Sequence, residues 1–219
     1  MEKPILSYHY TGYKTAWMAD GGEYLMFADL VLRNRSYRRF DGSFALSRET
    51  LRDLVGLARL TASASNRQPL KFFISNEKES NKQIFSCLTW AAQLKDWDGP
   101  SPQERPTAYI MLLGDNDISK KIEWDHGIAA QTILLGAAEQ ELGGCIFATV
   151  DRERLRRNLA VPERYRILLV IALGKPVEKV VIETAGDDIL YWRDAAGVHH
   201  VPKRPLEEII LNFPTPPPV

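Results

Sequence analysis

The sequence predicts one medium-sized domain in which helices and strands mix, and three observations support this. Its 219 residues suffice for a single core that buries about 70% of the surface of the unfolded chain. Apolar residues make up 45% and charged residues 26%, as in ordinary globular proteins. Helical and strand patterns follow one another with no internal repeat and no dividing linker. One domain is therefore the simplest division of the chain.

The two ends of the chain differ from this domain. Residues 1–25 are expected to be an N-terminal extension, because the first convincing helical pattern begins near Met26. The domain covers residues 26–211, and residues 212–219 form a proline-rich tail that suits neither a helix nor a central strand. We recognise no secretory signal and no run of roughly 18 apolar residues that would span a bilayer.

Local patterns place the elements of the domain. Residues 108–113 are apolar on both faces, which is typical of a central strand, and residues 167–173 form a second apolar strand. Ser47 and Asp151 are suitable N-caps, because their side-chain oxygens accept hydrogen bonds from the first turn of a helix. The other expected elements are a helix after Ser47 with the stripe Leu51, Leu54, Val55 and Ala58, a strand over 72–75, a helix over 81–90, a helix over 152–159, and a hairpin whose strands, 190–192 and 198–201, flank a turn at 194–197.

The segment 125–142 is apolar around most of its circumference for more than two helical turns. Such a helix must be covered on all sides. It is either the buried central helix of the domain or the element through which two subunits pack. Its small residues, such as Gly127 and Gly136, permit close helix approach. We favour the dimer.

The segment 33–39 packs the four positive charges of Arg33, Arg35, Arg38 and Arg39 into seven residues, just after an apolar helical run. The whole chain has 28 Lys and Arg against 28 Asp and Glu, which argues against a nucleic-acid partner. A dense cluster on a neutral background favours one compact anion such as a phosphate, because the arginine fork pairs with phosphate oxygens. A solvated basic turn is the alternative.

Two further segments are candidate binding elements. Residues 63–69 concentrate hydroxyls and amides between a helix and a strand, where they can offer donors and acceptors to a heteroaromatic edge. Lys203 and Arg204 stand between two prolines that stiffen the backbone. Taken singly, the first segment is better explained as an ordinary helix-ending loop, and the second as a solvated pair of charges.

Cysteine and histidine are scarce. Cys87 and Cys145 lie in apolar surroundings and are too few for a disulfide framework, so we expect a reducing, cytoplasmic setting. His199 and His200 are neighbours in an expected strand, so their side chains point to opposite faces, and we expect no metal site.

Together these segments resemble, in order along the chain, the FMN-dependent nitroreductase family. Residues 33–40 are similar to the opening motif of that family, and 63–69 to its Ser-x-x-Asn-x-Gln-Pro loop. The 127–143 helix, the strand end at 173–176 and the segment 201–208 follow in the family's order. The resemblance covers roughly residues 26–211. Two features depart from the pattern: Asn34 stands where many relatives have a basic residue, and residues 1–25 have no counterpart.

The resemblance implies an α+β fold with a central, mostly antiparallel sheet wrapped by helices, in an intertwined homodimer with FMN at the interface. It implies that the FMN phosphate is held by Arg35, Ser36, Lys203 and Arg204, assisted by Arg33. It places Arg38 at the pyrimidine edge of the flavin. It also implies that Ser65, Asn66 and Gln68 line the isoalloxazine from the other subunit, and that backbone amides near Ala148 and Thr149 face flavin N5.

The activity that the resemblance implies is that of an NAD(P)H oxidoreductase. FMN would take a hydride from NADH or NADPH and pass it to a nitroaromatic or quinone-like small acceptor in a ping-pong cycle. No catalytic side chain is needed, because the flavin carries the chemistry. The alternative is a flavin-binding protein on the same scaffold that lacks this turnover: a flavin-handling protein, a sensor or a flavin-consuming enzyme.

Overall fold

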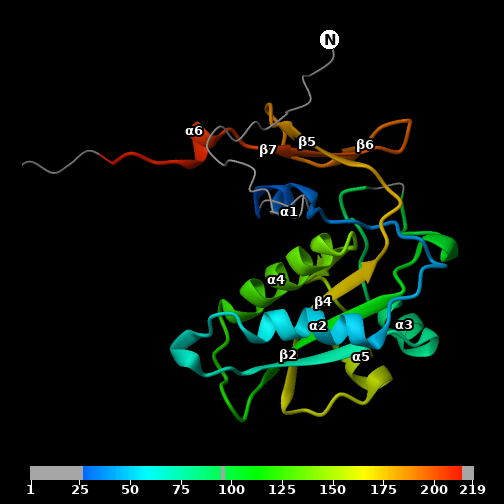
Figure 1. Ribbon diagram of the computed structural model, residues 1–219, viewed down its shortest axis with the longest axis vertical. Helices are drawn as coiled ribbons and strands as arrows, with labels where there is room; N and C mark the ends of the chain where they lie inside the picture. Colours follow the sequence, from blue (N-terminus) through cyan, green and yellow to red (C-terminus); the bar gives the residue numbers. More distant parts are fainter. Residues whose placement is uncertain (1–26, 95–96, 214–219) are drawn as a thin grey trace, which may run out of the picture.

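Figure 1 shows the computed structural model, which describes residues 27–94 and 97–213. The extension expected at 1–25 lies outside the described residues, as does most of the proline-rich tail. The proposed boundaries at 25/26 and 211/212 therefore remain predictions.

A four-stranded antiparallel sheet forms the centre of the fold, in the order β1-β2-β4-β3. Its strands are β1 (Leu70–Ser75), β2 (Ala108–Asp115), β3 (Gly143–Phe147) and β4 (Tyr165–Gly174). All eight residues of β2 are buried, since this strand has a neighbour on each side and a packed layer on each face. The two apolar strands expected from the sequence are thus the central pair, β2 and β4.

Alternate residues of β2 face two separate hydrophobic clusters, as the pleat of a strand requires. Ile110 and Leu112 belong to a cluster that includes residues of α2 (Arg48–Arg59) and α4 (Asp125–Glu139). Tyr109 and Met111 belong to a cluster on the other face, with residues of α3 (Lys78–Phe85) and α5 (Arg152–Leu159). Helices therefore cover both faces of the sheet, and the expected α+β class is confirmed. The remaining helices are α1 (Phe27–Arg33), α6 (Leu206–Ile209) and the short 3₁₀ turns η1 (Ala64–Asn66) and η2 (Pro102–Glu104).

Both predicted N-caps are confirmed. The backbone N–H of Thr50 donates to Ser47 Oγ at 3.0 Å, and that of Arg154 donates to Asp151 Oδ1 at 3.0 Å. The helix expected over 81–90 is wrong at both ends, because α3 runs from Lys78 to Phe85. Beyond it, the chain forms an isolated bridge between Leu88 and Val150, so a pairing distant in sequence ends the helix.

The apolar helix α4 is buried largely within its own subunit. It packs against α2 and against the central sheet, and residues such as Ala129, Ile133 and Ala137 are fully buried. Gly136 allows the close approach, since a Cβ there would overlap the side chain of Leu57. The central-helix alternative thus accounts for the buried face of α4. Ile128 on the same helix remains 42% exposed, and the homodimer stays a prediction.

A second sheet of three strands follows, in the order β5-β7-β6. It consists of β5 (Val180–Thr184), β6 (Trp192–Arg193) and β7 (His199–Lys203), with β5 parallel to β7. β6 and β7 form the expected hairpin, but its first strand lies at 192–193 and not at 190–192. In Figure 1 this sheet lies on the far side of α1 from α4. No helix in the described part of the chain is long and apolar enough to cross a membrane.

Candidate functional site

A pocket of about 380 Å³ lies where α1, α4, β3 and β7 meet. Among the described residues, no carboxylate lines it, whereas three cationic side chains do, which favours an anionic ligand. Its lining residues are Val31, Asn34, Arg35, Ser36, Arg38, Gln131, Leu134, Ile146, Tyr191, His199, Val201 and Lys203.

The segment after α1 is fixed against the end of the central sheet. The backbone N–H of Tyr37 donates to the carbonyl of Gly144 at 3.0 Å, and Phe40 forms a bridge with Pro176. Phe40 is fully buried, and a Cβ at Gly174 would lie 2.8 Å from its ring. Glycine at the end of β4 therefore admits Phe40, and the segment 35–38 is held at the pocket.

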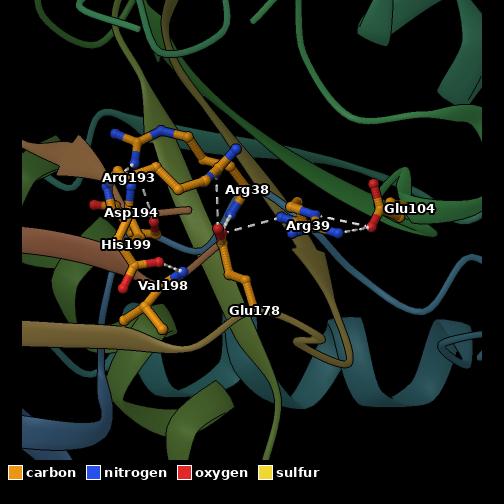
Figure 2. A network of polar contacts seen from close by, with 9 residues as sticks. Arg38, Arg39, Glu104, Glu178, Arg193, Asp194, Val198 and His199 are labelled. Atoms are coloured by element: carbon orange, nitrogen blue, oxygen red, sulfur yellow. Dashed lines mark hydrogen bonds and ion pairs between the residues drawn. The ribbon is translucent and has the colours of Figure 1, made fainter. Parts of the chain in front are cut away.

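Glu178 anchors the same segment through its carboxylate (Figure 2). Its Oε1 accepts the backbone N–H groups of Arg38 and of Arg39, the latter at 3.1 Å, and its Oε2 accepts from Arg193 Nη2 at 3.0 Å. The Glu178 side chain is only 1% exposed. Three hydrogen-bond donors, one of them the Arg193 guanidinium, offset the cost of burying this carboxylate. Glu178 can therefore hold the backbone of Arg38 in place.

The Arg38 guanidinium contacts two residues of the second sheet and its hairpin. Its Nη1 lies 3.1 Å from His199 Nε2, and its Cζ lies 4.8 Å from the centre of the Tyr191 ring. His199 is 1% exposed, and burial, together with the charges of Arg38 and Arg193 and the neighbouring His200, lowers its pKa to about 4. The imidazole is therefore neutral near pH 7, and its Nε2 accepts the hydrogen bond, because a guanidinium can only donate.

Arg35 is held against α1 by a hydrogen bond from its Nη2 to the carbonyl of Val31. Burial lowers its pKa, and its buried Nε has no partner among the described residues. Arg39, in contrast, donates to Glu104, and that hydrogen bond raises the pKa of Arg39. Of the two, only Arg35 is directed to the pocket, with Ser36 beside it.

The structure brings Arg35, Ser36, Arg38 and Lys203 together in one pocket. Arg33 lies outside it, in a neighbouring hollow with Tyr37 and Glu141. Arg204 is not among the lining residues and pairs instead with Glu208.

The other expected site residues do not line this pocket of their own subunit. Ser65, Asn66 and Gln68 lie in the loop between α2 and β1, and all three have left-handed φ values, of 53°, 50° and 51°. Ala148 and Thr149 follow β3 and are exposed. The Ala148 carbonyl accepts from Arg152 Nη2 at 2.9 Å, whereas Ile146, two residues earlier, does line the pocket.

Sequence reasoning missed Glu178, Tyr191 and the role of His199. His199 was considered only as a metal ligand, and its contact with Arg38 joins residues 161 positions apart. A single acid in a loop has no local pattern that marks it. Among the described residues, no group of three or more His, Cys, Asp or Glu side chains is placed to hold a metal ion.

Comparisons with known proteins agree on one family. The model of the nitroreductase family matches residues 31–175. A protein of Archaeoglobus fulgidus, provisionally named an NADH dehydrogenase/NAD(P)H nitroreductase, is 26% identical over 166 residues, which are 72% of this chain and 90% of that protein.

Solved structures show the same fold at lower identity. A nitroreductase family protein from Streptococcus pneumoniae superposes with a TM-score of 0.63 at 17% identity, over 86% of this chain and all of that one. An FMN-dependent nitroreductase from Clostridium difficile superposes with a TM-score of 0.55 at 21% identity, over 72% of this chain and 91% of that one. Since the family model alone spans more than half of the sequence, the chain belongs to the nitroreductase family.

Proposed function

We propose that the protein is an FMN-dependent NAD(P)H oxidoreductase that reduces nitroaromatic or quinone-like small molecules. Membership of the nitroreductase family indicates an oxidoreductase, and one structural neighbour is an FMN-dependent nitroreductase. The observation that carries the proposal is the pocket lined by Arg35, Arg38 and Lys203, to which the described part of the chain contributes no carboxylate. Such a donor set fits the phosphate of a flavin mononucleotide.

Each lining residue has a role in this proposal. Arg35, Ser36 and Lys203 would hold the phosphate, and the unpartnered Nε of Arg35 leaves a donor for it. Arg38 would place its positive charge beside the pyrimidine edge of the flavin, where it favours the reduced form. When bound, FMN supplies the hydride chemistry, and the protein contributes binding, orientation and charge.

The proposal includes a homodimer whose partner subunit completes the site. The loop with Ser65, Asn66 and Gln68 does not line the pocket of its own chain, so a second subunit would have to supply it. Large apolar side chains are exposed on α1, before α4 and near the C-terminus, as expected of surfaces that a partner covers. They include Phe27 at 69%, Trp124 at 69%, Leu211 at 70% and Phe213 at 83% exposed.

We also propose a cytoplasmic location. Cys87 and Cys145 are both buried and unpaired, a state that a reducing compartment preserves.

The visible absorption spectrum of the purified protein tests the proposal. We expect a flavin spectrum that bleaches on anaerobic addition of NADPH or NADH, and returns when a nitroaromatic compound or a quinone is added. A flavin spectrum that neither nucleotide bleaches would replace the oxidoreductase with a flavin-binding protein without turnover. A colourless protein that takes up no FMN would overturn the assignment of the pocket. Sedimentation of the same sample tests the dimer.

A further inference from the structure

Arg38 differs from two neighbouring arginines, Arg39 and Arg193, in what compensates its charge (Figure 2). Arg39 forms an ion pair with Glu104, and Arg193 forms one with Glu178. The guanidinium of Arg38 forms no ion pair within the described chain; its partners are the carbonyl of Ser36, at 3.3 Å, and the ring of His199, at 3.1 Å. Its positive charge thus remains uncompensated by residues 27–94 and 97–213, which supply no carboxylate to the lining of this pocket.

His199 is a suitable partner because it accepts a hydrogen bond without bringing a negative charge. Its Nε2 faces the Arg38 donor, so the ring proton lies on Nδ1, which is buried and has no partner among the described residues. The ring also packs against Tyr191, with 5.2 Å between the ring centres, and Tyr191 lies beneath the guanidinium. The acceptor and the aromatic face together fix the plane of the guanidinium.

The residues that orient Arg38 come from a different part of the chain than Arg38 itself. The nitroreductase family model matches residues 31–175, which include Arg38. Tyr191 and His199, and Glu178, which holds the backbone N–H of Arg38, all lie beyond that match, in or beside the second sheet. The orientation of Arg38 is thus a contribution of this chain's C-terminal segment.

A carboxylate in place of His199 would also orient Arg38, but it would cancel the charge. The Coulomb attraction between an arginine and an anion is largest where few other charges and little water screen it. A neutral acceptor is the arrangement that orients the guanidinium and preserves its attraction for an anion.

We propose that His199 is a positioning residue that orients the Arg38 guanidinium toward a bound anionic ligand while leaving its positive charge uncompensated. The ligand is FMN, which is anionic through its phosphate and, once reduced, through its deprotonated ring as well, so this inference rests on the proposed function. His199 acts through Arg38 and takes no part in the chemistry itself.

Three substitutions separate orientation from charge. His199→Gln keeps a neutral acceptor, His199→Glu keeps an acceptor but adds a negative charge, and His199→Leu removes the acceptor. The matched control is His200→Gln, since His200 is the next residue of β7 but stacks on Trp192 and does not line the pocket. FMN affinity of the flavin-free proteins and the midpoint potential of the bound flavin are measured for each.

We expect His199→Gln and the control to bind FMN within about threefold of the wild type, and His199→Leu and His199→Glu to bind it roughly tenfold or more weakly, because a hydrogen bond to a charged group is lost or its charge is cancelled. We expect the midpoint potential to be unchanged in His199→Gln and more negative in His199→Glu. In an Arg38→Ala background, His199→Leu should have no further effect on FMN affinity, since the residue acts through Arg38.

Other outcomes overturn the inference. If the glutamine and glutamate variants bind FMN equally well and have the same flavin potential, the charge of Arg38 is not what His199 preserves. If the effect of His199→Leu on FMN affinity persists undiminished without Arg38, His199 does not act through Arg38. If His199→Leu fails to fold, which circular dichroism reveals, the comparison of His199→Gln with His199→Glu still decides whether His199 preserves the charge of Arg38. A wild-type protein that takes up no FMN overturns the proposed function as well. If the wild type binds FMN and the His199 variants bind it with the same affinity and flavin potential, only the role of His199 is overturned.

Discussion

The hydroxyl of Ser63 donates a hydrogen bond to the buried carboxylate of Asp125, with 2.5 Å between the two oxygens. The second oxygen of Asp125 accepts from the backbone N–H of Ala64 at 3.2 Å, and Ser63 Oγ accepts from the backbone N–H of Gln68 at 2.9 Å. These bonds tie the loop before β1 to the first residue of α4. The left-handed backbone of this loop costs free energy in non-glycine residues, so we infer that Asp125 helps to hold it in place.

Asp125→Ala is therefore expected to destabilise the protein. It leaves the Ser63 hydroxyl and the Ala64 N–H without their acceptor, and we expect the free energy of unfolding to fall by about 2 kcal/mol. Asp125→Asn keeps one acceptor oxygen and should lose about half as much. Urea unfolding of the flavin-free protein measures both changes. Equal stability of the alanine variant and the wild type would show that the loop needs no such anchor.

The sequence predicted the elements whose cause is local. The caps at Ser47 and Asp151 were recognised because the bond that each makes lies within four residues. The strands β2 and β4 were recognised because burial on both faces leaves an apolar run. The end of α3 was misplaced because it depends on the bridge between Leu88 and Val150, which no local pattern encodes.

The candidate site also has features that the local sequence predicts and features that depend on residues distant in sequence. The cluster after α1 was visible as a density of charge, and its members Arg35, Ser36 and Arg38 do line one pocket. Which arginines of the cluster form an ion pair was not predictable, because Glu104, the partner of Arg39, and His199, the neutral partner of Arg38, lie far away in sequence. Charge density is a local property, whereas charge compensation depends on the tertiary fold.

Arg35→Ala tests the assignment of the phosphate site. It removes a charge-assisted contact worth about 1.5–3 kcal/mol, so FMN should bind roughly 10- to 150-fold more weakly. Arg33→Ala is the matched control, since it removes the same charge from the same cluster but from outside the pocket. We expect the control to change the dissociation constant less than threefold, as measured by fluorescence titration of FMN. Equal losses in both variants would mean that the cluster attracts FMN by its total charge alone.

Ala160→Gly is expected to stabilise the protein. Ala160 ends α5 with a left-handed φ of 49°, the conformation for which glycine is the usual residue. We expect a gain of about 0.5–1 kcal/mol in the free energy of unfolding, since relief of the strain exceeds the extra chain entropy of glycine.

The reverse exchange at Gly56 should stabilise as well, because this glycine lies inside α2 and an added Cβ meets nothing within 4 Å. We expect Gly56→Ala to gain about 1 kcal/mol from helix propensity. Urea unfolding of the two variants forms a matched pair. If one exchange raises the free energy of unfolding and the other lowers it, the same residue is preferred at both positions. Residue size rather than backbone conformation would then govern them.

The neutral state of His199 makes the stability of the protein depend on pH. The folded state holds the pKa of this residue at about 4, below its ordinary value, whereas the unfolded chain takes up the proton near pH 6.5. The unfolded state therefore binds more protons between these values, so the contribution of His199 to stability is intact above about pH 6.5 and declines as the pH falls toward 4. Between pH 7 and pH 5 this amounts to a loss on the order of 2 kcal/mol. His199→Gln lacks the titrating group. Between pH 7 and pH 5 its free energy of unfolding should therefore fall by about 2 kcal/mol less than that of the wild type. Parallel urea titrations at the two pH values measure the difference, and identical pH profiles would show that His199 titrates alike in the folded and unfolded states.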